Sequence, residues 1–236
     1  MKTKLTERQE KILDVAVREY VASAEPVSSQ ELLKKHDFGV SPATIRNEMQ
    51  KLTDKGFLSQ PHTSAGRVPT DKGYRFFVNN LLAKEKPDNK LALVDWGENE
   101  TDDTFKFIQN LTRHLAEKTR ALALNYVEDG DIFWKEGWEE VLREPEFEER
   151  DNIIDFTRLL ENFEEHIEDK KKEQGLSVYI GGENTYPKAK NFTIISSRYH
   201  LPSGEKGVIS IIGPKRMEYD KNINLINSLM RLLDNF

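Results

Sequence analysis

The chain has 236 residues, 37% of them hydrophobic and 32% charged, with a formal net charge of −6 and no cysteine. This length predicts one large domain or two small ones, and the lack of cysteine excludes disulfides and cysteine-bound zinc. We expect a cytoplasmic protein, because no apolar run approaches the ~20 residues that span a bilayer and no apolar segment follows the N-terminal lysines.

The first part of the chain alternates helix starts with turns. Residues 6–9 and 28–31 have capping-box spacing and predict two helix starts. After a glycine turn, Ser41 and Pro42 predict a third helix, because serine caps helices and proline fits the first helical position. That helix has a buried face made by Ile45, Met49 and Leu52. The order of helix, short helix, turn and helix is the helix-turn-helix pattern.

A predicted β-hairpin follows the third helix, which we expect Gly56 to end. Residues 57–60 predict one strand, residues 64–66 the turn, and residues 67–68 the start of the return strand. Thr70 then predicts the cap of a further helix that buries Tyr74, Phe77, Val78 and Leu81. We therefore predict a winged helix-turn-helix DNA-binding domain over residues 1–82.

Charge is distributed unevenly along the chain. Residues 1–86 contain 15 Lys and Arg against 11 Asp and Glu, whereas residues 87–236 contain 20 against 30. A small excess of Lys and Arg over Asp and Glu in residues 1–86 can also arise by chance. The helix-turn-helix pattern is therefore the stronger argument for DNA binding. Phosphate would repel the acidic second part, for which we expect a role in regulation or assembly.

The second part predicts a separate α+β domain. Residues 83–90 are charged, contain a proline and predict a linker to a domain over residues 91–236. Strands are predicted at residues 121–124, 176–180, 192–196 and 208–212. Helical apolar faces recur between Phe156 and Ile167 and between Ile223 and Leu233. Helices against an antiparallel sheet make the whole chain a mixed α/β protein of two domains.

Residues 40–81 resemble the DNA-binding domain of the HrcA family of bacterial heat-inducible transcription repressors. The run PHTSAGRVPTDKGYR is the most specific part of this resemblance. Residues 137–149, 178–184 and 207–233 resemble further blocks of the family. The resemblance implies that residues 91–236 form a GAF-like regulatory and assembly domain. It also implies an inserted dimerisation domain, which has no counterpart in the contracted region near residues 121–140.

The exposed side of the third helix supplies the candidate base-reading residues, which are Thr44, Arg46, Asn47 and Gln50. Arginine suits guanine, and asparagine or glutamine suits adenine, in the major groove. Ser41 and the first amides of this helix suit a phosphate. The alternatives are that Arg46 forms a salt bridge with a neighbouring glutamate and that Gln50 is plain helix surface.

The hairpin supplies the candidate wing contacts, His62, Thr63, Ser64 and Arg67. An arginine on a narrow hairpin can enter a minor groove, where narrowing strengthens the negative potential. The alternative is a solvated turn that carries an arginine by chance. The long match to the family favours DNA contact.

We find no sign of catalysis, a metal or a cofactor in the sequence. The five histidines are scattered without ligand spacing, and no nucleophile–base pair stands out. The glycines at residues 181–182 and 213 lack phosphate-loop spacing and predict turns at strand ends. We expect Arg216 to form a salt bridge rather than to bind an anion.

The resemblance implies a negative regulator of heat-shock (chaperone) genes that binds double-stranded DNA at an inverted-repeat CIRCE-type operator. It also implies a homodimer, no membrane contact, and dependence on temperature through the chaperonin GroEL. Two alternatives stay open. One is a ligand-responsive winged-helix regulator that senses a small molecule through its GAF-like domain, and the other is an interaction protein that engages the chaperonin without specific DNA binding.

Overall fold

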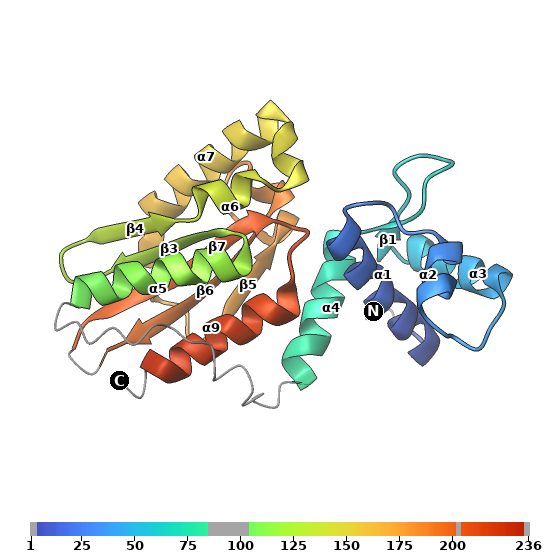
Figure 1. The fold of residues 1–236 in the computed structure, drawn as a ribbon, viewed down its shortest axis with the longest axis horizontal. Coiled ribbons are helices and arrows are strands. Elements are labelled where there is room, and N and C mark those ends of the chain that lie inside the picture. Colours follow the sequence, from blue (N-terminus) through green and yellow to red (C-terminus); the bar gives the residue numbers. More distant parts are fainter. Residues whose placement is uncertain (1–3, 85–103, 202–203, 234–236) are drawn as a thin grey trace. The chain divides into compact units, whose positions relative to one another are not determined.

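The computed structural model describes residues 4–84, 104–201 and 204–233, and the chain divides into two units, Met1–Glu85 and Lys86–Phe236 (Figure 1). Of the predicted linker, residues 83–84 are helical and residues 85–90 lie outside the described residues. Within the described ranges, no helix has the length and apolar character needed to cross a membrane.

Unit 1 consists of four helices and a two-stranded antiparallel sheet. The elements are α1 (Glu7–Ser23), α2 (Ser29–Lys35), α3 (Pro42–Asp54), β1 (Leu58–Ser59), β2 (Val68–Pro69) and α4 (Asp71–Lys84). The predicted helix starts are confirmed, because Thr6 and Ser28 form capping boxes and Ser41 caps α3. Thr70 accepts a hydrogen bond from the Gly73 amide and so caps α4. The strands are shorter than predicted.

The core of unit 1 explains how α3 is held. Its apolar face (Ile45, Met49 and Leu52) is buried, as predicted, together with Ile12, Leu13, Ala16 and Val17 of α1 and Tyr74, Phe77 and Val78 of α4. Each of the larger apolar side chains in this set contributes about 1.5–3 kcal/mol when it leaves water. Burial of one face leaves the opposite face of α3 in solvent.

Unit 2 is a five-stranded antiparallel sheet with strand order β4-β3-β7-β6-β5. Its strands are β3 (Leu122–Val127), β4 (Ile132–Glu136), β5 (Ser177–Ile180), β6 (Phe192–His200) and β7 (Lys206–Pro214). Its helices are α5 (Thr104–Thr119), α6 (Trp138–Leu142), α7 (Arg150–Glu165), α8 (Ile167–Lys171) and α9 (Tyr219–Leu233). Three short 3-10 segments, Pro145–Glu148, Gly181–Glu183 and Ala189–Asn191, complete the described part of the unit.

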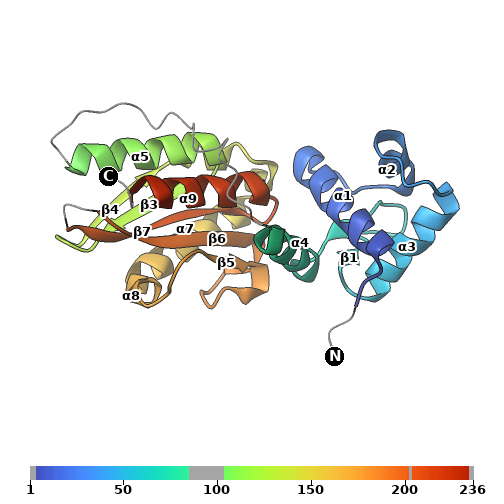
Figure 2. The ribbon, with the colours of Figure 1, turned by 90° about the horizontal axis from the view of Figure 1, so that it is seen from below.

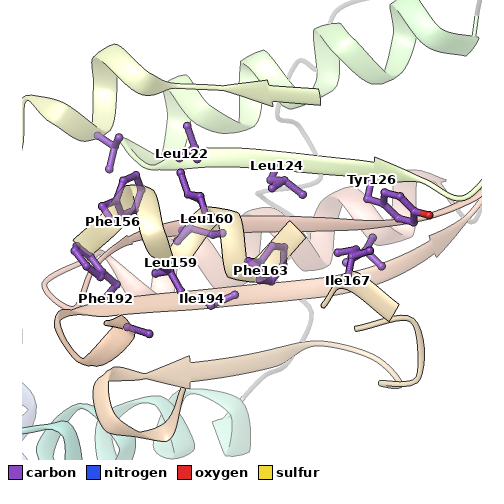
Figure 3. Close-up of a cluster of buried hydrophobic side chains, with 14 of the residues drawn as sticks. Leu122, Leu124, Tyr126, Phe156, Leu159, Leu160, Phe163, Ile167, Phe192 and Ile194 are labelled. Carbon is purple, nitrogen blue, oxygen red and sulfur yellow. The ribbon is translucent and has the colours of Figure 1, made fainter. Parts of the chain in front are cut away.

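The helices cover both faces of this sheet. Helices α5 and α9 lie on one face, and α7 and α8 lie on the other (Figure 2). Alternate residues of β3 turn towards α7, and Leu122 and Leu124 join a buried cluster with Phe156 and Phe163 (Figure 3). The chain is therefore a mixed α and β protein, as predicted.

The predicted strands of unit 2 are present, with two differences. Strand β4 was not predicted and lies in the region near residues 121–140, where it pairs with β3 across a tight turn. Strands β3, β6 and β7 are longer than predicted, because backbone pairing also holds polar residues such as Asn125, Arg198 and His200 in the sheet. Ile167, which was predicted to continue the α7 face, begins α8 and is still buried.

Candidate nucleic-acid interface

Helix α3 presents its predicted polar residues to solvent. Ser41, Arg46, Asn47 and Gln50 are exposed, and Thr44 is half-buried. We call these five residues the stripe. They lie together because α3 places residues three and four apart on one face, while Ile45, Met49 and Leu52 face the core. Four of the five predicted α3 residues therefore share a solvent-exposed surface.

Arg46 and Asn47 are the two members of this stripe whose side chains have no hydrogen-bond or ion-pair partner among the described residues. The expected alternative for Arg46, a salt bridge to a neighbouring glutamate, is not present within that part of the chain. A guanidinium and an amide with all their donors in water can bind base edges without first breaking a bond inside the protein.

The polar groups at the start of α3 already bond to each other, which the sequence did not suggest. The Ser41 hydroxyl accepts a hydrogen bond from the Thr44 amide at 3.2 Å and lies 3.0 Å from the Thr44 hydroxyl. Pro42 has no N–H, and so Ala43 supplies the remaining amide of the first turn. The N-terminus of α3 can offer a phosphate one amide and two hydroxyls that already contact each other.

Gln50 and Arg67 contact each other instead of standing free. The Arg67 guanidinium donates to Gln50 Oε1 at 2.9 Å and to the Thr53 hydroxyl at 3.1 Å, while Gln50 Nε2 donates to Asp54 at 2.8 Å. Arg67 thus lies at the base of the hairpin and against α3, away from the hairpin tip. Two hydrogen bonds from Arg67 therefore join the exposed face of α3 to the hairpin.

The loop between β1 and β2 carries His62, Thr63 and Ser64, all of which are exposed. Gln60 donates two hydrogen bonds across the loop, to the Thr63 and Ala65 carbonyls, both at 2.9 Å. The turn was predicted at residues 64–66, and this is wrong. The Ala65 amide bonds to the His62 carbonyl at 2.9 Å, so Thr63 and Ser64 occupy the centre of the turn.

Gly66 is needed at the base of the hairpin for close backbone approach. Val27 and Arg67 exchange two backbone hydrogen bonds, at 2.9 and 2.8 Å. A Cβ added to Gly66 would lie 2.5 Å from the Pro26 and Val27 backbone. The hairpin is therefore fastened to the segment between α1 and α2 as well as to α3.

Beneath the exposed stripe, α3 is tied to α1 by a polar network. The buried Glu48 carboxylate accepts from Gln9 at 2.8 Å and from Lys51 at 2.9 Å, and Gln9 Oε1 accepts from Lys55 at 2.8 Å. Hydrogen bonds from Lys51 and Gln9 hold the pKa of the Glu48 carboxyl below its ordinary value. An ionised Glu48 thus fixes the rotation of α3 about its axis.

Sequence reasoning missed Gln60, Thr53 and Glu48, which position the interface. Glu48 is buried, Thr53 is half-buried, and Gln60 is exposed but bonds back across its own loop. Glu48 differs from the other α3 residues in one visible way, because it is a charged residue on the buried side of the helical pattern. Nothing in the spacing of Gln60 or Thr53 marks their roles, since their partners are set by the hairpin.

Unit 2 confirms the expectation for Arg216. Its guanidinium donates to Glu146 at 2.8 and 3.0 Å and also bonds to Glu144. These bonds connect the segment after α6 to the turn before α9. The planar fork of arginine is well suited to carboxylates, and here they occupy it.

Three comparisons place the chain among known proteins. Residues 75–223 match the family described as HrcA protein C terminal domain. The heat-inducible transcription repressor HrcA of Thermoanaerobacter sp. (strain X514) is 29% identical over 98% of this chain and 96% of the relative. The repressor of the same name from Brevibacillus brevis is 30% identical over 95% of this chain and 96% of the relative. A solved structure, "Crystal structure of a hypothetical protein at 2.2 A resolution", shares the fold with a TM-score of 0.79 at 22% identity over 98% of both chains.

These relatives and the exposed polar face of α3 define the class as transcription repressors, which are regulators and not a class of enzymes. The alignment with the Thermoanaerobacter protein runs over 333 positions, so a long stretch of that relative has no counterpart in the 236 residues of this chain. The family match covers more than half of the chain, and the chain belongs to the HrcA family.

Proposed function

We propose that this protein represses heat-shock (chaperone) genes by binding an inverted-repeat, CIRCE-type operator as a homodimer in the cytoplasm. Membership of the HrcA family supports negative regulation of heat-shock genes. We take unit 1 as a winged helix-turn-helix in which α3 is the recognition helix. The observation that carries the proposal is the exposed α3 face, on which Arg46 and Asn47 are unpaired within the described residues.

In this proposal each part of the interface has a separate task. Arg46 reads guanine and Asn47 reads adenine in the major groove, with Thr44 and Gln50 beside them. Ser41 and the wing residues His62, Thr63, Ser64 and Arg67 contact the backbone or the adjacent minor groove. Helix-turn-helix readers match two-fold symmetric sites, which is why we infer a homodimer.

We take unit 2 as a GAF-like regulatory and assembly domain. Its antiparallel sheet between two helical layers and its excess of acidic residues support a role away from the DNA. In the resembled family the chaperonin GroEL helps the repressor to reach its active state, and we propose the same partner here. Heat then lowers the DNA-competent population by occupying the chaperonin.

Footprinting on the upstream region of the protein's own chaperone operon, combined with sedimentation equilibrium, tests this proposal. We expect both arms of an inverted repeat to be protected and a mass of two chains per duplex. A duplex with one arm scrambled is the matched control and should lose most of the affinity. A monomer that protects no symmetric site would contradict the proposal.

A further inference from the structure

Unit 2 exposes a cluster of large apolar side chains on α6 and α7, which we call the ridge. It consists of Trp138, Leu142, Ile153 and Ile154, which are 40%, 42%, 40% and 39% exposed. Trp138 and Leu142 are one turn apart on α6. The Trp138 ring packs edge-on against Phe156 at 6.1 Å, and Phe156 lies one turn after Ile153 on α7. Trp138 and Ile153 thus both lie beside the buried Phe156 ring, and exposed apolar side chains gathered in this way commonly mark an interaction site.

An open pocket of about 310 Å³ adjoins the ridge at Trp138. Four carboxylates line it, those of Glu117, Glu136, Glu139 and Glu140, against the two cations Arg113 and Lys135. Arg113 pairs with Glu136 at 3.7 Å, and Lys135 pairs with Glu164, outside the pocket, at 2.9 Å. Neither Glu117 nor Glu140 has an ion-pair partner within the described part of the chain. The pocket thus places Trp138 beside two uncompensated negative charges.

The surroundings of the ridge are acidic as well. Residues 139–165 contain eleven Asp and Glu against three Arg. A two-fold contact of this surface with the same surface of a second copy would place like charges opposite each other, which is costly. Charge complementarity therefore favours a different occupant, one that brings positive charge together with large apolar side chains.

We propose that the ridge and its pocket dock a basic, apolar segment of a partner protein. A lysine or arginine of that segment enters the pocket between the Trp138 ring and the carboxylates of Glu117 and Glu140. A cation that lies over an indole face and near carboxylates is attracted both by the ring and by the negative charges. Leucine-sized side chains of the same segment cover Leu142 and Ile153. This surface is separate from the α3 face that we assign to DNA.

The test uses fluorescence anisotropy with the full chain and a labelled amphipathic helical peptide made of leucine and lysine. A peptide with glutamate in place of lysine is the matched probe. We expect the lysine peptide alone to bind, and Trp138→Ala and Glu140→Lys each to raise its Kd about tenfold. Asp129→Lys makes the same charge reversal in the β3–β4 turn, at the far end of that hairpin, and should leave Kd within about twofold.

Several results would overturn this inference. Equal weakening by Asp129→Lys and Glu140→Lys would show that the peptide senses only overall charge. An unchanged Kd for Trp138→Ala, or no binding of the lysine peptide to the full chain, would remove the ridge as a docking surface. A change in the protein's own sedimenting mass on Trp138→Ala would show that a second copy covers it. Operator binding and thermal unfolding of each variant confirm that it is folded.

Discussion

At the scale of single residues, the side chains of the recognition face differ in whether the protein already uses them. Gln50 and Arg67 are bonded to each other, and Ser41 is bonded to Thr44. Arg46 and Asn47 are unpaired within the described ranges. A bonded side chain must give up its partner before it binds DNA, and the bonds it loses offset those it gains. We therefore expect Arg46 and Asn47 to contribute most to the choice of base.

Arg46 can be tested with a pair of substitutions. Arg46→Ala should cost about 1–3 kcal/mol in operator binding and relax specificity at one base pair of each half-site. Arg46→Lys keeps the charge but loses the planar fork, so it should retain affinity for random DNA and still lose the discrimination. Anisotropy titrations on the operator and on duplexes substituted at single positions measure both quantities. Full discrimination by Arg46→Lys would assign Arg46 to a phosphate instead.

Glu48 gives unit 1 a dependence on pH. Because the folded-state pKa of Glu48 lies below its ordinary value of 4.5, ionised Glu48 stabilises unit 1 above that value. This stability is lost as the pH falls through the lower, folded-state pKa. We expect the protection factors of the α1 and α3 amides, measured against their intrinsic exchange rates, to fall on acidification from pH 5. The variant Glu48→Gln should exchange faster at pH 7 and show a weaker pH dependence, and an equal dependence in both proteins would contradict this role.

At the scale of elements, the sequence predicts those features that depend on neighbours along the chain. Capping boxes begin α1 and α2, and serine before proline begins α3, because each device is complete within four residues. The buried face of α3 follows from helical periodicity. The polar side of the same helix predicts the base-reading residues, whose exposure the structure shows for Arg46, Asn47 and Gln50 and whose contacts with DNA remain a prediction.

What the sequence could not predict depends on partners that are distant in the chain. Strand β4 is short and lies at the sheet edge, so only its pairing with β3 identifies it. The position of the hairpin turn depends on how Gly66 meets Val27, 39 residues earlier. The contact between Arg67 and Gln50 likewise requires the hairpin to fold back on α3. Local patterns carry no information on these contacts.

Gly66 permits a direct test of the hairpin attachment. Gly66→Ala would place a methyl group 2.5 Å from the backbone of residues 26–27 and should break the bridge between Val27 and Arg67. Gly56→Ala is the matched control, because Gly56 has open space but a φ of +75°, which costs an alanine about 1–2 kcal/mol. We expect Gly66→Ala to destabilise unit 1 more than the control and to weaken operator binding. Urea unfolding and anisotropy measure the two effects, and equal losses in both variants would contradict them.

At the scale of the whole molecule, the division into two units predicts two unfolding transitions. Trp134 and Trp138 belong to the described part of unit 2, and no tryptophan falls within residues 1–85, so tryptophan fluorescence serves as the probe of unit 2. Operator DNA at a hundredfold excess over Kd should stabilise unit 1 by about 2.7 kcal/mol and raise its Tm by roughly 10 °C. The tryptophan transition should stay in place.

Calorimetry and fluorescence on the same sample compare the two units, with a scrambled duplex as the control. An equal shift of both transitions would mean that the units unfold together, and that a change in unit 2 reaches unit 1 through shared stability. If the two transitions are independent, unit 2 would instead have to influence DNA binding through the assembly of two chains.

The fastening of the hairpin to α3 and to the segment before α2 has a consequence for how operators can change during evolution. The bonds of Arg67 to Gln50, Thr53 and Val27 set a fixed spacing between helix and hairpin. Exchanging one base pair for another alters only the contacts at that position, so each exchange lowers the affinity for DNA by a limited amount. Inserting one pair between the positions that the helix and the hairpin touch displaces the second by about 3.4 Å and turns it by roughly 35° around the duplex. A protein whose helix and hairpin keep a fixed spacing therefore tolerates base-pair substitutions in its site far better than insertions or deletions.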